Sequence, residues 1–552
     1  MKKKLLLTLT ILLGCVSFAK AEVEINSKNF PDAGFRTWVQ SHFNKPNGVT
    51  LTDEELASVK EILSWEDNDF HDVGSLQGIE YFPELETLGI FNCKTAGANY
   101  NTVKRVDLTR NKKLKKFIFT ANQKFTSWNP ERVSGITSLD HSSAQISSKA
   151  APISYLIEAN LHDLPELEIV DLDEHGLLNL DLRGCKSLKS VKVTQTSGDN
   201  TLRLKMDTCT NLETLCITKI RIVEGFDLGK TPNLKSLKCD YCSLSSLDVS
   251  TLRNLEELSC SGNDLAELDL SNCKKLKNLN CCGTSFAWFD FNQLDSLTSI
   301  DISNSKSLRT FPALPSGIKT IVCDNVNAFA KVKVNIYPNL TSLSAKNCGL
   351  TEFDAVNLPN LTALDLSDNH IAAVNLAPGL TVKKDNFKID QSLNIIAIPE
   401  GSQTNFWRVV LPKSVDLSHI YSYDFNSSEV AQSSRCTLYK ECYQDGQGEK
   451  FPSFVTNYLP TNSSYVWNFH YQYKTGAFYE DTDGTKKELL SKVTVYTKRG
   501  ATGVDDVAAA KAVKGVKYFD LQGHESAEPF SGFNIEVTQY TDGTTSSTKV
   551  VR

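Results

Sequence analysis

Three consecutive segments repeat one pattern: NLKSLKCDYCSLSSLDVSTL (233–252), NLEELSCSGNDLAELDLSNC (254–273) and KLKNLNCCGTSFAWFDFNQL (275–294). One position is always leucine, at Leu237, Leu258 and Leu279, and another is always cysteine, at Cys239, Cys260 and Cys281. A period of about 20 to 29 residues with an L-x-x-L-x-L core is typical of leucine-rich repeats. The sequence therefore predicts a solenoid of stacked turns whose leucines and cysteines form interior columns.

The leucine position stays apolar on both sides of these segments, at Val170, Val191, Leu215, Ile300, Ile321, Leu343 and Leu364. We therefore expect regular repeats over 167–384 and irregular ones over 67–166, where insertions at 91–102 and 141–155 break the period. A 21-residue turn is too short for an outer helix. The fold expected is a parallel β coil with few helices, extended on both its inner and outer faces.

Residues 22–66 are predicted to form a helical cap that covers the open end of the coil. Apolar residues at helical spacing in 28–43, with Phe35 and Trp38 among them, indicate one helix, and TDEELASVKEIL (52–63) indicates a second. Thr52 and Glu55 would form its capping box. The loop between the helices resembles a degenerate EF-hand, so calcium binding and a simple helical cap both remain open; we expect no metal or other cofactor.

The N-terminus is typical of an export signal over residues 1–21, with three lysines, an apolar run and an Ala-Lys-Ala cleavage site. The alternative is a lipobox ending at Cys15, which would make that cysteine a lipid anchor. No later run is long and apolar enough for a transmembrane helix. The predicted location is therefore outside the cell, either secreted or on the outer surface.

Fifteen cysteines in an exported chain would ordinarily indicate disulfides. Most of them instead recur at three positions of the repeat. The first position holds Cys239, Cys260, Cys281 and Cys323. The second holds Cys242 and Cys348, where other turns have Asn263 and Asn369, and the third holds Cys185, Cys209 and Cys273. We interpret them as buried free thiols that pack as small apolar side chains. This includes the C-x-x-C at 239–242. Cys436 and Cys442 lie outside the coil and are either bonded or free.

Residues 385–500 read as a β-sandwich-like domain, because strand-like runs alternate with Pro, Gly, Asn and Ser. In YVWNFHYQY (465–473), alternation places five aromatic residues on one side of a strand. This stripe is either domain core or a sugar-stacking platform. Residues 501–515 follow as a linker.

Residues 516–552 resemble the C-terminal sorting domains of type IX secretion cargo. The resemblance rests on Phe519-x-Leu521-x-Gly523, on Gly532-Phe533-Asn534-Ile535 and on a final Lys549-Val550. It implies a small β module that is recognised at a bacterial outer membrane.

The regular repeats resemble the 21-residue cysteine-containing repeats of the internalin J type, most closely at 258–271 and 364–376. The match covers about two fifths of the chain, and Pro312 and Pro315 interrupt it. The resemblance implies a bacterial surface adhesion protein with a binding role and names no ligand.

The residues that alternate with the inward column should point outward and form a polar strand face. The candidate partner-binding residues on it are Lys238, Asp240, Ser259, Ser261, Asn280, Asp301, Ser303, Asp324, Lys346 and Asp365. Trp, Tyr and Arg, the usual hot-spot residues, are missing from this set. A weak or multivalent protein contact is therefore expected.

No nucleophile, zinc-protease or P-loop motif occurs, so no catalytic residue is nominated and the chain is not expected to be an enzyme. The formal charge of −6 argues against nucleic acid as a partner. A basic stretch within 104–116 is interpreted as a solvated outer face. The sequence predicts a non-catalytic adhesion protein that binds a host or bacterial surface protein; the alternative is glycan binding through 385–500.

Overall fold

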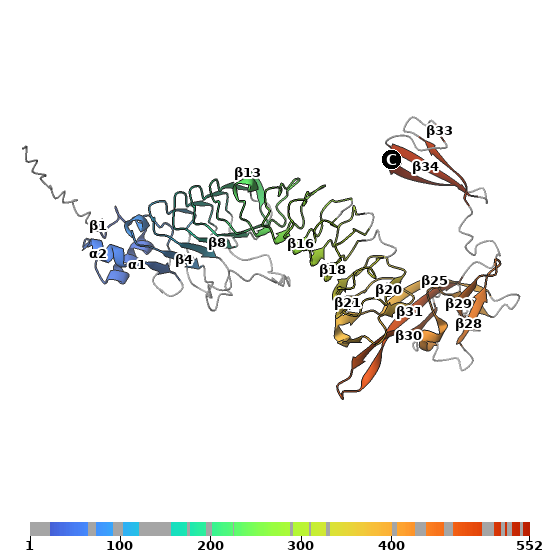
Figure 1. Cartoon of the computed structure of the whole chain (residues 1–552). Coiled ribbons are helices and arrows are strands. Elements are labelled where there is room, and N and C mark those ends of the chain that lie inside the picture. The colour runs from blue at the N-terminus through green and yellow to red at the C-terminus, as the bar shows by residue number, and fades with distance from the viewer. Residues whose placement is uncertain are drawn as a thin grey trace, which may run out of the picture. The chain divides into compact units, whose positions relative to one another are not determined.

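The computed structural model describes residues 23–64, 73–91, 103–120, 156–173, 177–194, 201–224, 226–287, 291–308, 311–326, 332–399, 406–425, 438–456, 467–499, 513–519, 525–526, 533–540 and 545–551. The predicted export signal, Cys15, the sequence ITSLD (136–140), Cys436 and most of the 501–515 linker lie outside these ranges. The chain divides into two compact units, Met1–Cys348 with Leu358–Leu364, and Gly349–Asn357 with Asp365–Arg552, and each is described by itself (Figure 1).

The N-terminal cap contains helices α1 (Ala33–Phe43) and α2 (Asp53–Ser58), and a short ribbon of β1 (Val23–Glu24) with β2 (Thr50–Leu51). Phe35 and Trp38 are buried in α1 as predicted. Thr52 and Glu55 form the predicted capping box. The second helix ends earlier than expected, at Ser58, because β3 (Glu61–Leu63) instead pairs with β4 as the first strand of the coil.

The inner face of the first unit is a parallel sheet in which each turn adds one strand. After β3 come β4 (Thr87–Phe91), β6 (Lys116–Thr120), β8 (Ile169–Asp173), β10 (Ser190–Thr194), β12 (Thr214–Thr218), β14 (Ser236–Lys238), β15 (Glu257–Ser259), β16 (Asn278–Asn280), β17 (Ser299–Asp301), β18 (Thr320–Val322) and β19 (Ser342–Ser344). The fold is thus the predicted parallel β coil.

The predicted apolar column is confirmed residue by residue. Leu237 pairs with Leu258, and the same register runs through Leu279, Ile300, Ile321 and Leu343. All of these side chains are buried. Because parallel strands lie about 4.8 Å apart, equivalent side chains of successive turns are in contact and exclude water along the coil.

The predicted free thiols are also confirmed, and they hydrogen-bond between turns. No disulfide joins the four buried cysteines of the first repeat position, which are Cys239, Cys260, Cys281 and Cys323. Burial raises the pKa of the Cys260 thiol to about 12, so it stays protonated. The thiols of Cys281 and Cys323 donate to the carbonyl oxygen of the next turn, at 3.5 and 3.4 Å.

The outer face is less regular than expected. Early turns pair there in a five-stranded parallel sheet of β5 (Arg105–Asp107), β7 (Glu158–Asn160), β9 (Asn179–Asp181), β11 (Thr201–Lys205) and β13 (Arg221–Glu224). Later turns form no strand at their L-D-V-S and L-D-L-S segments. There Asp248 and Asp269 accept hydrogen bonds from the backbone N–H of Ser250 and Ser271, which turns the chain toward the next corner.

The second unit contains the last turns of the coil, with β20 (Phe353–Ala355) and β22 (Val374–Leu376), and a sheet that folds over itself. Its strands are β23 (Thr381–Val382), β25 (Gln391–Pro399), β26 (Trp407–Val410), β27 (Ile420–Phe425), β28 (Leu438–Gln444), β29 (Lys450–Thr456), β30 (Trp467–Glu480) and β31 (Lys486–Arg499). Phe454 of β29 packs against Phe469 and Tyr471 of β30, with ring centroids 5.0 and 5.8 Å apart. These rings form a sandwich-like core.

Strand β30 also packs on the last coil turn within this unit. The hydroxyl of Tyr471 donates to the carbonyl of Ala372 at 2.6 Å, and β30 contacts β22. The interior of the last turn is therefore covered by protein rather than left open to solvent. The C-terminal residues form a separate four-stranded sheet of β32 (Val513–Phe519), β33 (Glu525–Ser526), β34 (Phe533–Tyr540) and β35 (Thr545–Val551).

Asn263 links three neighbouring segments of backbone inside the coil. Its amide nitrogen donates to the carbonyls of Cys239 and Cys260 at 2.8 and 2.9 Å, and its oxygen accepts from the N–H groups of Cys242 and Leu244, both at 3.0 Å. Replacing it with alanine leaves these buried groups without partners.

We expect Asn263→Ala to lower the free energy of unfolding by about 2–4 kcal/mol. Asn272→Ala is the matched control, because Asn272 is exposed and donates a single bond to Ser250; its cost should stay within about 1 kcal/mol. Urea unfolding followed by circular dichroism measures both. Equal costs for the two variants would contradict this role for Asn263.

Candidate binding site on the strand face

The outward side chains of β14 to β19 form a continuous face. Because side chains alternate along a strand, Lys238 points outward between the inward Leu237 and Cys239, and the following turns repeat this arrangement. The register places Lys238, Ser259, Asn280, Asp301, Val322 and Ser344 in one outward column. We call the outward side of β14 to β19 the strand face.

The predicted partner-binding residues differ in how far they reach solvent. Lys346 is exposed, and Lys238, Asp240, Asn280, Asp301 and Asp324 are partly exposed. The three serines, Ser259, Ser261 and Ser303, are only 8, 5 and 5% exposed. Asp365 belongs to the second unit, where it pairs with Lys388 at 3.2 Å. Solvent-accessible contact groups therefore come mainly from the long and charged members of the set.

Two aspartates of the set bond to the neighbouring turn. Oδ1 of Asp240 accepts from the Ser259 hydroxyl at 2.6 Å and from the Ser261 N–H at 2.8 Å. Asp324 repeats this arrangement with the Ser344 hydroxyl at 2.6 Å and the Lys346 N–H at 2.9 Å. These carboxylates stabilise the stacking of turns, so removing either would perturb the fold as well as the surface.

Asp301 lies in a different environment. Its Oδ1 accepts from the N–H of Ser303 at 2.9 Å, within the same turn. Burial raises the pKa of its carboxyl, the Ser303 hydrogen bonds oppose this rise, and the nearby Asp324 charge adds to it. Within the described ranges no cation pairs with Asp301.

A shallow hollow of about 330 Å³ lies over the middle of the strand face. Lys238, Ser259, Asn280 and Asp301, all predicted from sequence, contribute to its wall together with Glu257 and Asn278. It brings together four of the ten predicted residues. The wall mixes polar with apolar groups, Val322 among the latter, and carries charge at Lys238 on β14, Glu257 on β15 and Asp301 on β17.

Sequence reasoning missed Tyr241, which lies at the border of this face. Its side chain is 56% exposed, and its backbone is left-handed, with φ of 56°. The equivalent positions of the next turns hold Gly262, Gly283, Asn304 and Asn325, residues that tolerate this conformation. A Cβ on Gly262 would lie 2.3 Å from the Tyr241 ring, so the ring lies directly on that glycine. The sequence signal was an aromatic residue at a position that glycine or asparagine holds in the next four turns, while the preceding turn holds Lys219 there, also left-handed.

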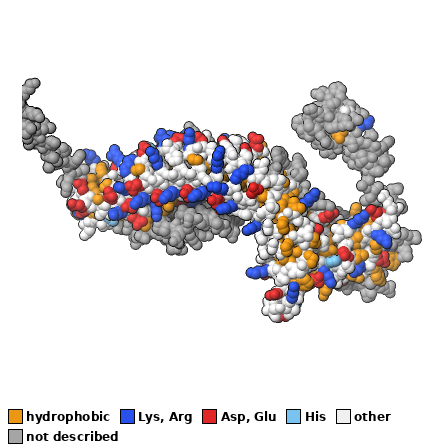
Figure 2. Space-filling view, in the orientation of Figure 1, with side chains coloured by type: hydrophobic (Ala, Val, Ile, Leu, Met, Phe, Trp, Pro, Cys, Tyr) orange, Lys and Arg blue, Asp and Glu red, His pale blue; other side chains and the backbone are white. Residues whose placement is uncertain are grey.

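Beside the strand face, lysine and glutamate alternate from turn to turn. The register aligns Lys60, Glu86, Lys115, Glu168, Lys189, Glu213, Lys235, Glu256 and Lys277. Ion pairs join Lys115 to Glu86 at 2.7 Å and Lys277 to Glu256 at 2.6 Å. Figure 2 shows the resulting mixture of basic and acidic side chains on the first unit. Lys113 and Lys115 of the basic stretch are thus paired.

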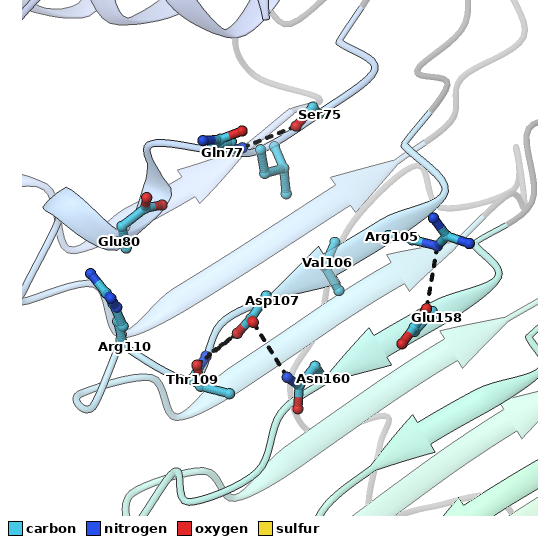
Figure 3. A pocket seen from close by; sticks show the side chains of 11 residues that line it. Ser75, Gln77, Glu80, Arg105, Val106, Asp107, Thr109, Arg110, Glu158 and Asn160 are labelled. Carbon is cyan, nitrogen blue, oxygen red and sulfur yellow. Dashed lines mark hydrogen bonds and ion pairs between the residues drawn. The ribbon is translucent and has the colours of Figure 1, made fainter. Parts of the chain in front are cut away.

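A second hollow, of about 460 Å³, lies near the cap (Figure 3). Arg105 pairs with Glu158 at 3.3 Å across its wall. Asp107 accepts from Thr109 and from Asn160, the latter at 3.3 Å. Charges of both signs line this hollow, and Arg105 and Glu158 bond to each other, so it does not favour one ligand chemistry.

The structure offers no metal site at the positions considered. In the described ranges, no group of three or more His, Cys, Asp or Glu side chains could hold a metal ion. In the EF-hand-like loop, the Lys45 ammonium pairs with Glu55 at 2.6 Å, so a lysine occupies the neighbourhood that a calcium ion would need. Asp171, Asp173, Glu174 and His175 are the densest group of polar side chains in the sequence of the coil. Asp171 pairs with Lys192 at 3.6 Å, and Glu174 and His175 lie outside the described residues.

The aromatic stripe of β30 is core. Phe469, Tyr471 and Tyr473 are each at most 1% exposed, so they cannot stack on a sugar. Tyr465 and the side chain of Trp467 lie outside the described residues. Of the two alternatives for this stripe, core is therefore confirmed for its described members, because buried residues of β25, β26, β29 and β31 cluster with these rings.

Asp301 gives this face a testable dependence on pH. Its raised pKa means that folding opposes ionisation, so its favourable contribution to stability is full below the ordinary carboxyl pKa of about 3.9 and is lost as the pH rises through the folded value. We expect Asp301→Asn, which keeps an oxygen for Ser303, to melt higher than wild type at pH 7 and equally near pH 3.5.

The control is Asp248→Asn. Hydrogen bonds from Ser250 lower the pKa of Asp248, so its ionised form stabilises the fold and the substitution should lower, not raise, the melting temperature at pH 7. Thermal unfolding at both pH values measures the two variants. A melting temperature of Asp301→Asn below that of wild type at pH 7 would contradict the assignment.

Among the residues that the structure describes, no helix has both the length and the apolar character needed to cross a bilayer. Comparison with protein-family descriptions gives no match, and neither does a search of curated proteins. Two solved structures from Listeria monocytogenes are similar. One is a functional domain of InlJ that includes a cysteine ladder, at 16% identity and a TM-score of 0.47 over 87% of this chain and 99% of that one. The other is the internalin InlF of strain 4b F2365, at 19% identity and a TM-score of 0.40 over 64% of this chain and 94% of that one.

Proposed function

We propose that this chain is a non-catalytic, exported adhesion protein that binds a host or bacterial surface protein through the strand face and its border at Tyr241. The observation that carries this proposal is an exposed aromatic residue, Tyr241, in a left-handed backbone conformation at the border of the strand face. Strain of this kind costs on the order of 1–3 kcal/mol and persists where it serves a function.

The chemistry of the face supports a protein partner. The hollow is open, and amide, hydroxyl and charged groups line it together with apolar ones such as Val322, a mixture that suits the surface of another protein better than a small apolar ligand. Tyrosine is enriched among the residues that dominate interface energies. Tyr241 supplies the anchor that the polar positions lack, and the surrounding polar groups give complementarity.

We expect Tyr241→Asn to separate binding from folding. Asparagine tolerates a left-handed backbone, as Asn304 and Asn325 do at equivalent positions, so the melting temperature should stay the same or rise. Loss of the ring should weaken partner binding about tenfold or more. The measurement is the affinity of the purified full chain for proteins detected on a panel of host and bacterial surface proteins.

Tyr439→Asn is the matched control, because Tyr439 is also exposed, at 49%, and lies in the other unit. Partners that bind the Tyr241→Asn variant as tightly as wild type would contradict this site. Loss of binding only in Tyr439→Asn would place the interface in the second unit.

The location outside the cell rests on residues 1–21 and on the type IX sorting resemblance of 516–552. We expect deletion of 516–552 to leave the protein inside the cell envelope, because the coil and the sandwich-like domain carry no other sorting resemblance. Fractionation with an antibody to the coil measures this. Unchanged delivery to the surface or the medium would refute the sorting role.

The N-terminal alternative has its own test. A diacylglyceryl group on the mature N-terminus would assign Cys15 as a lipid anchor.

A further inference from the structure

Aspartate occupies the same outward repeat position in three turns, at Asp171, Asp301 and Asp365. A lysine of the following turn pairs with two of these three carboxylates. Asp171 pairs with Lys192 at 3.6 Å, and Asp365 pairs with Lys388 at 3.2 Å. The register places Val322 at the corresponding position after Asp301. On the other side, the preceding turn places the neutral Asn280 beside it. Of these three repeats, only that of Asp301 lacks a built-in cation among the described residues.

The missing cation coincides with the hollow. Asp301 and Val322 both line it, so the space beside the carboxylate is open to a group from outside. The outward side chains of β14 to β19 and the residues that directly follow these strands include four carboxylates, Asp240, Glu257, Asp301 and Asp324, and two lysines, Lys238 and Lys346. A cationic group entering here would meet a surface that is acidic on balance.

The charged residues of the hollow differ between its two ends: Lys238 lies with Glu257 of the neighbouring turn at one end, and Asp301 lies toward the other. Lys238 and Asp301 lie three turns apart, or about 14 Å at the usual strand spacing. A basic group is repelled by Lys238 and attracted to the Asp301 end, where Asp324 of the next turn adds further negative charge. The hollow therefore distinguishes one orientation of a charged partner from the other.

We propose that Asp301 receives a lysine or arginine side chain of the protein partner, in the position that Lys192 and Lys388 occupy in their own repeats. This proposal rests on the proposed function and adds the chemistry of the partner to it. The ammonium or guanidinium donates to the free oxygen of the carboxylate, and Ser303 continues to hold the other oxygen. Val322 keeps the site vacant, since a lysine there would close it.

The probe is a labelled, end-blocked peptide of alternating serine and arginine, compared with the same peptide carrying citrulline, which keeps the shape and removes the charge. We expect the full chain to bind the arginine peptide weakly and the citrulline peptide about tenfold more weakly still. Asp301→Asn should reduce arginine-peptide affinity to the citrulline level. Glu267→Gln is the control for loss of one acidic charge, since Glu267 is exposed outside the hollow.

A second pair of variants tests the vacancy itself. Val322→Lys should pair with Asp301 from within, as Lys192 does with Asp171, and should lower arginine-peptide affinity as much as Asp301→Asn does. Val322→Leu adds bulk without charge and should leave the affinity within about twofold of wild type.

Equal binding of the two peptides would overturn the proposal, and so would full retention of affinity in Asp301→Asn. A partner that depends on Tyr241 but not on Asp301 would refute this inference and leave the proposed function standing. If Tyr241→Asn and Asp301→Asn both bind the partner as tightly as wild type, this inference and the proposed function are both refuted.

Discussion

Backbone pairing between consecutive turns is the constraint on which the rest of this protein depends. Each strand of the coil bonds to the strand one turn before and one turn after, so residues that share a repeat position share an environment. Inward positions must be apolar or must satisfy buried polar groups, as Asn263 does for the backbone around Cys239 and Leu244. Backbone pairing therefore determines which side chains point outward and are available for binding.

A repeated environment makes exceptions informative. Asp301 differs from Asp171 and Asp365 in that the next turn provides no cation, and this difference leaves a carboxylate without an internal counter-ion among the described residues. Tyr241 occupies a left-handed position that glycine or asparagine fills in the following turns. Neighbouring turns stack in the same way with other residues at these two positions. Asp301 and Tyr241 are therefore the best candidates for selection by a partner.

The interior columns of the coil could be predicted from the sequence, but where the coil begins and how far its outward side chains are exposed could not. Periodicity identified Leu237, Cys239 and their equivalents because burial demands the same residue class in every turn. It did not show that β3 replaces the end of the second helix, since Ile62 suits either an amphipathic helix or a strand until its pairing with Leu88 is known. Alternation also placed Ser259 and Ser303 on the outer side without revealing that they are nearly buried. Their burial depends on hydrogen bonds to adjacent turns, and a one-dimensional pattern does not contain those bonds.

The cysteines show how the same constraint decides chemistry. In-register parallel strands hold equivalent Cβ atoms about 4.8 Å apart with their bonds parallel, whereas a disulfide requires Cβ atoms about 3.5–4.5 Å apart and inclined toward each other. Neighbouring thiols such as Cys239 and Cys260 are therefore stacked at a spacing that disfavours disulfide formation. Burial raises the pKa of these thiols and removes the thiolate that oxidation needs. The column thus remains reduced for geometric reasons, and each thiol is free to fill space and, as at Cys281 and Cys323, to donate to the carbonyl of the next turn.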